Sequence, residues 1–143
     1  MKALPILCAL IVFSTMVCAQ DIRVHAIDKA LAVCEKKQGA FTRGEAECLT
    51  VALESWERDV TDTYDALKKQ VSDTELKSLA AGHKNWSEYR DREFEFINEL
   101  FLNKRGTMYV PRRISYRIEL VKARAVELET YLRAVRRLKG LEN

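Results

Sequence analysis

The most distinctive local sequence is the segment Trp86–Asp91, WSEYRD. Trp86 and Arg90 are four residues apart and share a helical face, so the guanidinium can lie against the indole ring. Arg90 also falls on an apolar stripe, where a charge needs a partner. Asp59 or Asp62 of the preceding segment could serve, and the sequence does not choose between them. We interpret the segment as a latch between helices, with a role in binding as the alternative.

Two other groups of residues could do acid–base chemistry. Asp91, Glu93 and Glu95 recur at a spacing of two, which sends their side chains to diverging sides of a helix and predicts a solvated face. His83 has apolar helical neighbours such as Leu79, and we expect a satisfied interior histidine rather than a base. The sequence contains no serine-centred elbow, metal-spaced histidine pair or glycine-rich phosphate loop. We therefore predict no catalytic residues, no enzymatic activity and no cofactor.

The cysteines indicate a disulfide. Of the four, the first two fall in the apolar N-terminal stretch, which leaves Cys34 and Cys48 as an even pair. In an oxidising compartment such a pair forms a disulfide by default. It would close a loop of about 15 residues and constrain the unfolded chain by about 3 kcal/mol. The alternative is a metal site, but a Cys-x-x-Cys pair is missing and only His25 and His83 could join it. We predict no metal site.

A basic loop is the best candidate for contact with a partner. Lys104, Arg105, Gly106 and Thr107 follow one another between two helical segments, and the glycine makes the loop flexible. Arg43, beside the disulfide, is a further candidate at the same kind of position. The alternative is an ordinary connection between helices.

A second basic cluster closes the sequence. Its members are Arg133, Arg136, Arg137 and Lys139. They could contact anionic lipid or an acidic partner, but cations in a last helical turn also complement the helix dipole. We favour the second interpretation.

Helical periodicity positions all these residues. The first helix is expected from about residue 21 to 37, and capping-box sequences that begin at Thr42 and Ser72 start the second and third. A fourth should run from residue 107 or 108 to Lys139, with Pro111 in its first turn, where a missing backbone donor costs little. Each of the last three helices carries a stripe of mostly apolar residues. In the second helix it runs through Leu49, Leu53, Trp56, Val60, Tyr64, Leu67 and Val71; in the third, through Leu76, Leu79, His83, Trp86, Arg90, Phe94, Ile97 and Phe101; and in the fourth, through Ile114, Ile118, Val121, Ala125, Leu128, Leu132 and Val135.

Short connections between long amphipathic helices make antiparallel neighbours. The fold class predicted is therefore all-α, an up-and-down bundle of three long helices plus a shorter N-terminal helix, with one disulfide.

The first 19 residues are typical of a secretory signal peptide. Lys2 precedes an apolar stretch that is too short for a membrane span, and small side chains lead up to Ala19. We expect cleavage after Ala19, a single domain over 20–143 and no stable membrane insertion afterwards. The exported protein is expected in the periplasm; full secretion, or lipid attachment at Cys18, is the alternative.

The charge balance argues against one class of partner. The chain has 24 Lys and Arg against 21 Asp and Glu, a net charge of +3. Loss of the signal would remove only Lys2 and leave +2. Proteins that bind nucleic acid concentrate basic charge, so we predict none as a partner.

A resemblance to a known family rests on Cys34, Cys48, Trp56, Tyr64, Trp86, Tyr89, Arg90, Asp91 and the run Gly106-Thr107-Met108. Together these residues resemble the LprI-like lysozyme-inhibitor family of exported bacterial helical proteins, from about Cys34 to Leu132. The resemblance implies an envelope protein that binds and blocks a peptidoglycan-cleaving muramidase. Many relatives carry a further cysteine after the Arg-Asp pair; Phe94 and Phe96 stand in that region here, so a second disulfide is not expected.

The sequence therefore supports a binding protein. Glycoside hydrolysis depends on two carboxyl groups, and the donor-rich loop from Lys104 to Thr107 could pair with one of them and exclude the sugar. The alternative is an envelope accessory or scaffold protein that docks another protein through a helix face.

Overall fold

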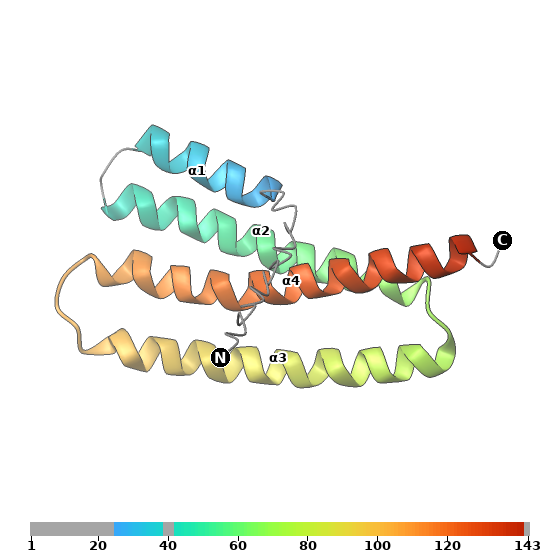
Figure 1. The fold of residues 1–143 in the computed structure, drawn as a ribbon. Coiled ribbons are helices and arrows are strands. Elements are labelled where there is room, and N and C mark those ends of the chain that lie inside the picture. Colours follow the sequence, from blue (N-terminus) through green and yellow to red (C-terminus); the bar gives the residue numbers. More distant parts are fainter. Residues whose placement is uncertain (1–24, 39–41, 142–143) are drawn as a thin grey trace, which may run out of the picture.

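The computed structural model describes residues 25–38 and 42–141. Four helices make up the fold: α1 (Ala26–Gln38), α2 (Thr42–Lys68), α3 (Asp73–Leu102) and α4 (Tyr109–Leu141). They run up and down beside one another (Figure 1), so the predicted all-α bundle of three long helices and a shorter first helix is confirmed. The predicted signal peptide lies outside the described residues. None of the described helices is both long and apolar enough to cross a membrane.

The predicted disulfide between Cys34 and Cys48 is present and joins α1 to α2, with 5.7 Å between the Cα atoms. It makes the first two helices a hairpin. The backbones also approach closely here, because a Cβ added to Gly44 would lie 2.8 Å from the Cβ of Gln38. No residue of α1 is fully buried. Ile27 and Leu31 pack against the core while partly exposed, so the disulfide and this partial packing hold the helix.

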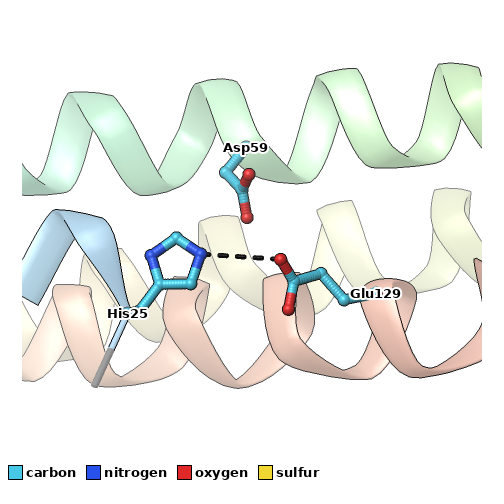
Figure 2. A group of neighbouring side chains, drawn as sticks. All are labelled: His25, Asp59 and Glu129. Carbon is cyan, nitrogen blue, oxygen red and sulfur yellow. Dashed lines mark ion pairs between the residues drawn. The ribbon is translucent and has the colours of Figure 1, made fainter. Parts of the chain in front are cut away.

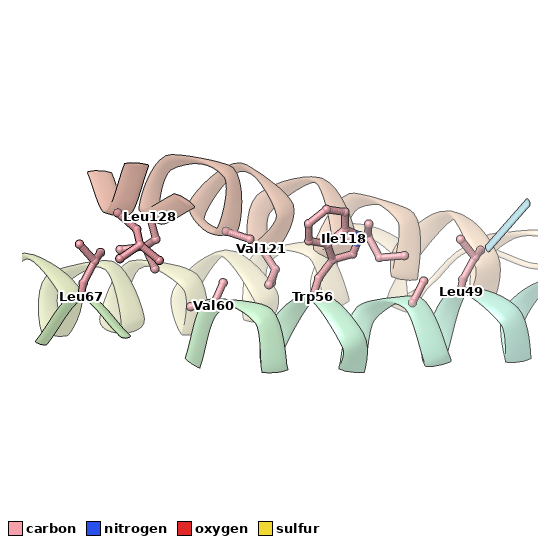
Figure 3. Packing of buried hydrophobic residues seen from close by; sticks show 10 residues of the cluster. Leu49, Trp56, Val60, Leu67, Ile118, Val121 and Leu128 are labelled. Carbon is pink, nitrogen blue, oxygen red and sulfur yellow. The ribbon is translucent and has the colours of Figure 1, made fainter. Parts of the chain in front are cut away.

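The core lies between α2 and α4, which form the most extensive helix contact in the bundle. Trp56 of α2 and Val121, Ala125 and Leu128 of α4 have no exposed surface. Figure 3 shows Trp56, Val121 and Leu128 between the two helices. The predicted stripes of both helices supply most of the core cluster. Burial of apolar area on this scale is the main source of stability in a small helical domain.

Helix α3 packs on α4 from the other side (Figure 1), with a much smaller contact. Its start is fixed by Ser72, whose hydroxyl accepts from the Glu75 amide while the Glu75 carboxylate accepts from the Ser72 amide at 2.8 Å, the predicted capping box. Ile97 is its one buried residue. The stripe predicted for this helix does face the bundle, but most of it is only half-buried.

The connection between α3 and α4 turns at one end of the bundle. Gly106 has a φ of +114°, the left-handed region that favours glycine. Pro111 lies in the first turn of α4, as predicted. This turn lies at the same end as the start of α2 (Figure 1), so the loop and the α1–α2 hairpin share one surface.

Candidate partner-binding surface

The surface at this end, here called the bundle end, consists of the start of α2, the loop between α3 and α4, and the first turns of α4. The side chains of Lys104, Arg105 and Thr107 are exposed, as the sequence predicts for a loop at a bundle end. Arg43 is also exposed. All four side chains therefore lie on surface that a partner could reach.

A hollow of about 430 Å³ brings two of these candidates together. It is lined by Thr42, Arg43 and Ala46 of α2 and by Thr107 and Val110. Arg43 and Thr107 are 64 positions apart in the sequence, so the fold, not the local sequence, makes them neighbours.

A second hollow of about 440 Å³ also includes Thr42 and extends along α4. Its lining adds Met108, Pro111 and Tyr116 to polar and charged side chains. Met108 and Tyr116 expose 60% and 50% of their surfaces. Interfaces combine apolar anchors of this type with a polar rim, so the bundle end has the composition of a docking surface.

The sequence predicted the charged half of this surface and missed the apolar half. Met108 and Val110 are exposed although they lie next to the start of an apolar stripe. The signal that could have found them is their position before Ile114, where the expected stripe of this helix begins.

Arg43 is partly engaged already. Its Nε donates to Glu47 Oε1 at 3.2 Å, and the two side chains are 92% and 60% exposed. Exposed pairs of this spacing contribute only a few tenths of a kcal/mol. A partner carboxylate could therefore replace Glu47 at little cost.

Of the two contacts predicted for Arg90, the one with the Trp86 ring is present and the ion pair with α2 is not. The Arg90 guanidinium lies 5.3 Å from the centre of the Trp86 ring, so the predicted contact is confirmed. The predicted ion pair of Arg90 with Asp59 or Asp62 is wrong. Arg90 pairs instead with the adjacent residue Asp91, with 2.7 Å between Arg90 Nη2 and Asp91 Oδ1. Arg90 is half-buried and lines the same hollow as Asp91. Its guanidinium can therefore pair with Asp91 without extending to a carboxylate of α2.

That hollow, of about 450 Å³, lies between α2 and α3 and is lined by Glu57, Val60, Thr61, His83, Trp86, Arg90, Asp91 and Phe94. A second guanidinium, that of Arg124 from α4, lies 5.7 Å from the Trp86 ring. Arginines of two helices therefore lie close to the indole. This geometry suits a contact that holds α3 against the bundle.

Three further residues carry the family resemblance: Trp56, Tyr64 and Tyr89. Trp56 is fully buried, with the His25 ring 4.3 Å away. Tyr64 stacks on His83 at 3.9 Å. Tyr89 is exposed on the outer face of α3. Of these three residues, only Tyr89 is exposed enough to touch a partner without rearrangement of the helices.

His83 was expected to be an interior histidine with its hydrogen bonds satisfied, and this is only partly so. It is half-buried, and its Nδ1 has no hydrogen-bond partner among the described residues. Burial lowers its pKa, and the nearby charges of Arg124 and Arg90 lower it further. The ring is therefore neutral at pH 7, and it contributes stacking rather than charge.

The other residues considered in the sequence, namely the carboxylates of α3, the two cysteines and the C-terminal basic cluster, do not come together in a site. Asp91 and Glu95 are exposed, as expected of a solvated face, and Glu93 is intermediate. Because Cys34 and Cys48 are bonded to each other, they offer no thiolate to a metal. The C-terminal basic cluster lies exposed in the last turns of α4.

Comparisons with known proteins agree with the fold and the sequence motifs. The family model described as lysozyme inhibitor LprI matches residues 34–128. A crystal structure of an uncharacterised protein from Burkholderia thailandensis is similar, with a TM-score of 0.73 and 22% identity over 79% of this chain. The match spans 56% of that protein's chain, and at this identity it shows the fold alone. No curated protein matches. The family match covers about two thirds of the sequence, and the chain belongs to the lysozyme inhibitor LprI family.

Proposed function

We propose that this protein is an exported inhibitor of lysozyme-type muramidases and that it occludes the substrate cleft with the bundle end. The family gives the general role. The observation that carries the choice of surface is the hollow shared by Arg43 and Thr107, with exposed Lys104 and Arg105 beside it and Val110 in its wall.

The chemistry of the target fits such a surface. A muramidase cleft presents two carboxyl groups across the scissile bond, and blocking either one stops the reaction. Arginine and lysine form strong charge-assisted hydrogen bonds with carboxylates. Met108 and Val110 can supply the apolar contact that pairing of charges alone does not. Export follows from the predicted signal peptide, and the periplasm is the proposed compartment.

A matched pair of double variants tests the surface. Lys104→Ala with Arg105→Ala removes two positive charges from the bundle end, and Arg136→Ala with Arg137→Ala removes two from the far end of α4. In a cell-wall clearing assay with several lysozyme types, we expect the first pair to weaken inhibition at least tenfold, about 1.4 kcal/mol. The second should change it less than twofold.

Circular dichroism on both double variants separates loss of binding from loss of fold, since these exposed changes should leave helicity intact. Equal inhibition by the two would move the site away from the loop. No inhibition by the unaltered protein, for any lysozyme type, would contradict the function itself.

One observation favours a second candidate function, an accessory protein that docks a partner through a helix face. Tyr89, Phe96 and Leu100 of α3 are 51%, 57% and 46% exposed, and their spacings of seven and four place them on one side of the helix. Phe96→Ser should abolish binding of such a partner and leave muramidase inhibition unchanged. Inhibition lost in Phe96→Ser and retained in Lys104→Ala with Arg105→Ala would favour this face instead.

A further inference from the structure

Three potential metal ligands from three separate parts of the chain meet in one half-buried place. His25 lies immediately before α1, Asp59 lies on α2 and Glu129 on α4, and their side chains point toward one another (Figure 2). One ligand atom of each lies within 4.8 Å of those of the other two. Residues so distant in sequence come together only in the folded chain.

The separation of two of these atoms fits a shared metal better than a hydrogen bond. His25 Nε2 lies 3.5 Å from Glu129 Oε1, beyond the usual N–H···O range of about 2.7–3.2 Å. Two ligands of a tetrahedral zinc ion, each about 2.0–2.2 Å from the metal, are about 3.3–3.5 Å apart. A cation between the two would leave the side chains close to where they are.

The charges at this site also favour a bound cation. Asp59 Oδ2 is buried and has no hydrogen-bond partner among the described residues. Burial raises the pKa of Asp59, and the charge of Glu129 raises it further, while His25 acts in the opposite direction. Two carboxylates that face one imidazole carry excess negative charge unless a proton or a metal ion joins them.

We propose that His25, Asp59 and Glu129 bind a divalent transition-metal ion, for which Zn²⁺ is the best match. One imidazole nitrogen and two carboxylate oxygens suit zinc, and three protein ligands leave a fourth position for water. The rival occupant of the same space is a proton shared by the two carboxylates. The sequence gives no sign of this site, because His25, Asp59 and Glu129 stand at no fixed spacing that is typical of metal ligands.

The structural consequence concerns α1. This helix buries no residue fully, and the disulfide fastens its C-terminal half to α2. The metal would fasten its start to α2 and α4 as well, so that a covalent bond and a coordination site hold the two ends of one weakly packed helix.

Binding would have one local signature. The Ile27 amide now donates to His25 Nδ1 at 3.2 Å. A neutral imidazole that binds metal through Nε2 carries its proton on Nδ1, so this hydrogen bond must break. We expect the Ile27 amide signal to shift in a ¹⁵N-resolved NMR spectrum when Zn²⁺ is added to the EDTA-treated protein.

Calorimetric titration of the purified, EDTA-treated chain with ZnCl₂ tests the site directly. We expect one ion per chain, with Kd at least tenfold weaker in Asp59→Asn and in Glu129→Gln. Glu54→Gln, an exposed change on the same helix as Asp59, is the control and should bind as the original protein does. Absence of binding, or equal binding in all four proteins, would overturn the proposal.

Thermal melts distinguish loss of the metal from loss of the fold. In EDTA, Asp59→Asn should melt higher than the original protein, because one of two repelling carboxylates is gone. Added Zn²⁺ should raise the melting temperature of the original protein and of Glu54→Gln but not that of Asp59→Asn. A zinc-dependent rise that persists in Asp59→Asn would place the ion elsewhere and contradict the site.

Discussion

His83 sits where burial and charge act in the same direction. Desolvation, Arg124 and Arg90 all lower its pKa, and Asp65 opposes them weakly, while the ring stacks on Tyr64. The unfolded chain, with an ordinary histidine pKa near 6.5, therefore takes up a proton at a higher pH than the folded protein. Because the unfolded state binds more protons in that window, stability falls as the pH drops below about 6.5.

The pH prediction uses His83→Gln. We expect the original protein to lose stability between pH 7.5 and 5.5, and the variant to lose less, in urea unfolding at the two pH values. Carboxylates titrate in both proteins, so the difference between them isolates the histidine. An equal loss in both would mean that His83 does not couple folding to pH.

Two glycines on different helices allow a matched comparison. Gly44 has the Gln38 Cβ 2.8 Å from where its own Cβ would stand, whereas Gly82 on α3 has nothing within 4 Å. Overpacking typically costs about 1–3 kcal/mol, and alanine in a helix gains about 1 kcal/mol over glycine. The two effects oppose each other in Gly44→Ala, so we expect it to be destabilised by up to about 2 kcal/mol. Gly82→Ala should be stabilised by about 1 kcal/mol, and urea unfolding measures both. Stabilisation of both variants would show that Gln38, at the end of α1, can move away from the new methyl group without loss of stability.

At the scale of elements, periodicity predicted which faces of α2, α3 and α4 turn inward, because apolar side chains at helical spacing must be buried together. The starts of α2 and α3 followed from capping sequences. The extent of burial did not follow: the stripe of α3 resembles that of α4 in sequence, yet only Ile97 is buried.

Contacts between helices were equally beyond prediction. These contacts depend on how the helices are rotated and offset, which spacing within one helix does not specify. They include the approach of Arg124 to the Trp86 ring, the hollow shared by Arg43 and Thr107, and the cluster around Glu129.

The disulfide is the element-scale constraint with the clearest test. Cys34→Ser combined with Cys48→Ala should lower stability by about 3 kcal/mol, since it frees a loop of about 15 residues in the unfolded chain. Amide exchange should show the loss first in α1, which buries no residue fully, while α2 and α4 keep their protection. Uniform loss along all four helices, or an unchanged melting temperature, would contradict this view of α1.

For the whole molecule, net charge sets how it meets a partner. The chain carries +3 and the signal contributes one of these charges, while lysozymes are commonly basic. With the proposed lysozyme partner, long-range steering would therefore be weakly repulsive, and affinity would have to come from local fit. We expect the association rate measured by stopped flow to stay level or fall as ionic strength is lowered. A rate that climbs steeply at low salt would indicate an acidic partner instead.

The bundle end and the C-terminus lie at opposite ends of α4 (Figure 1), a helix of 33 residues and so about 50 Å long. A tether attached after residue 141 would therefore point the loop that we propose to bind the enzyme away from the point of attachment, with the helix itself as a stiff spacer. Immobilised on a bead or fused to a reporter in that orientation, the protein should capture its enzyme as readily as it does in solution.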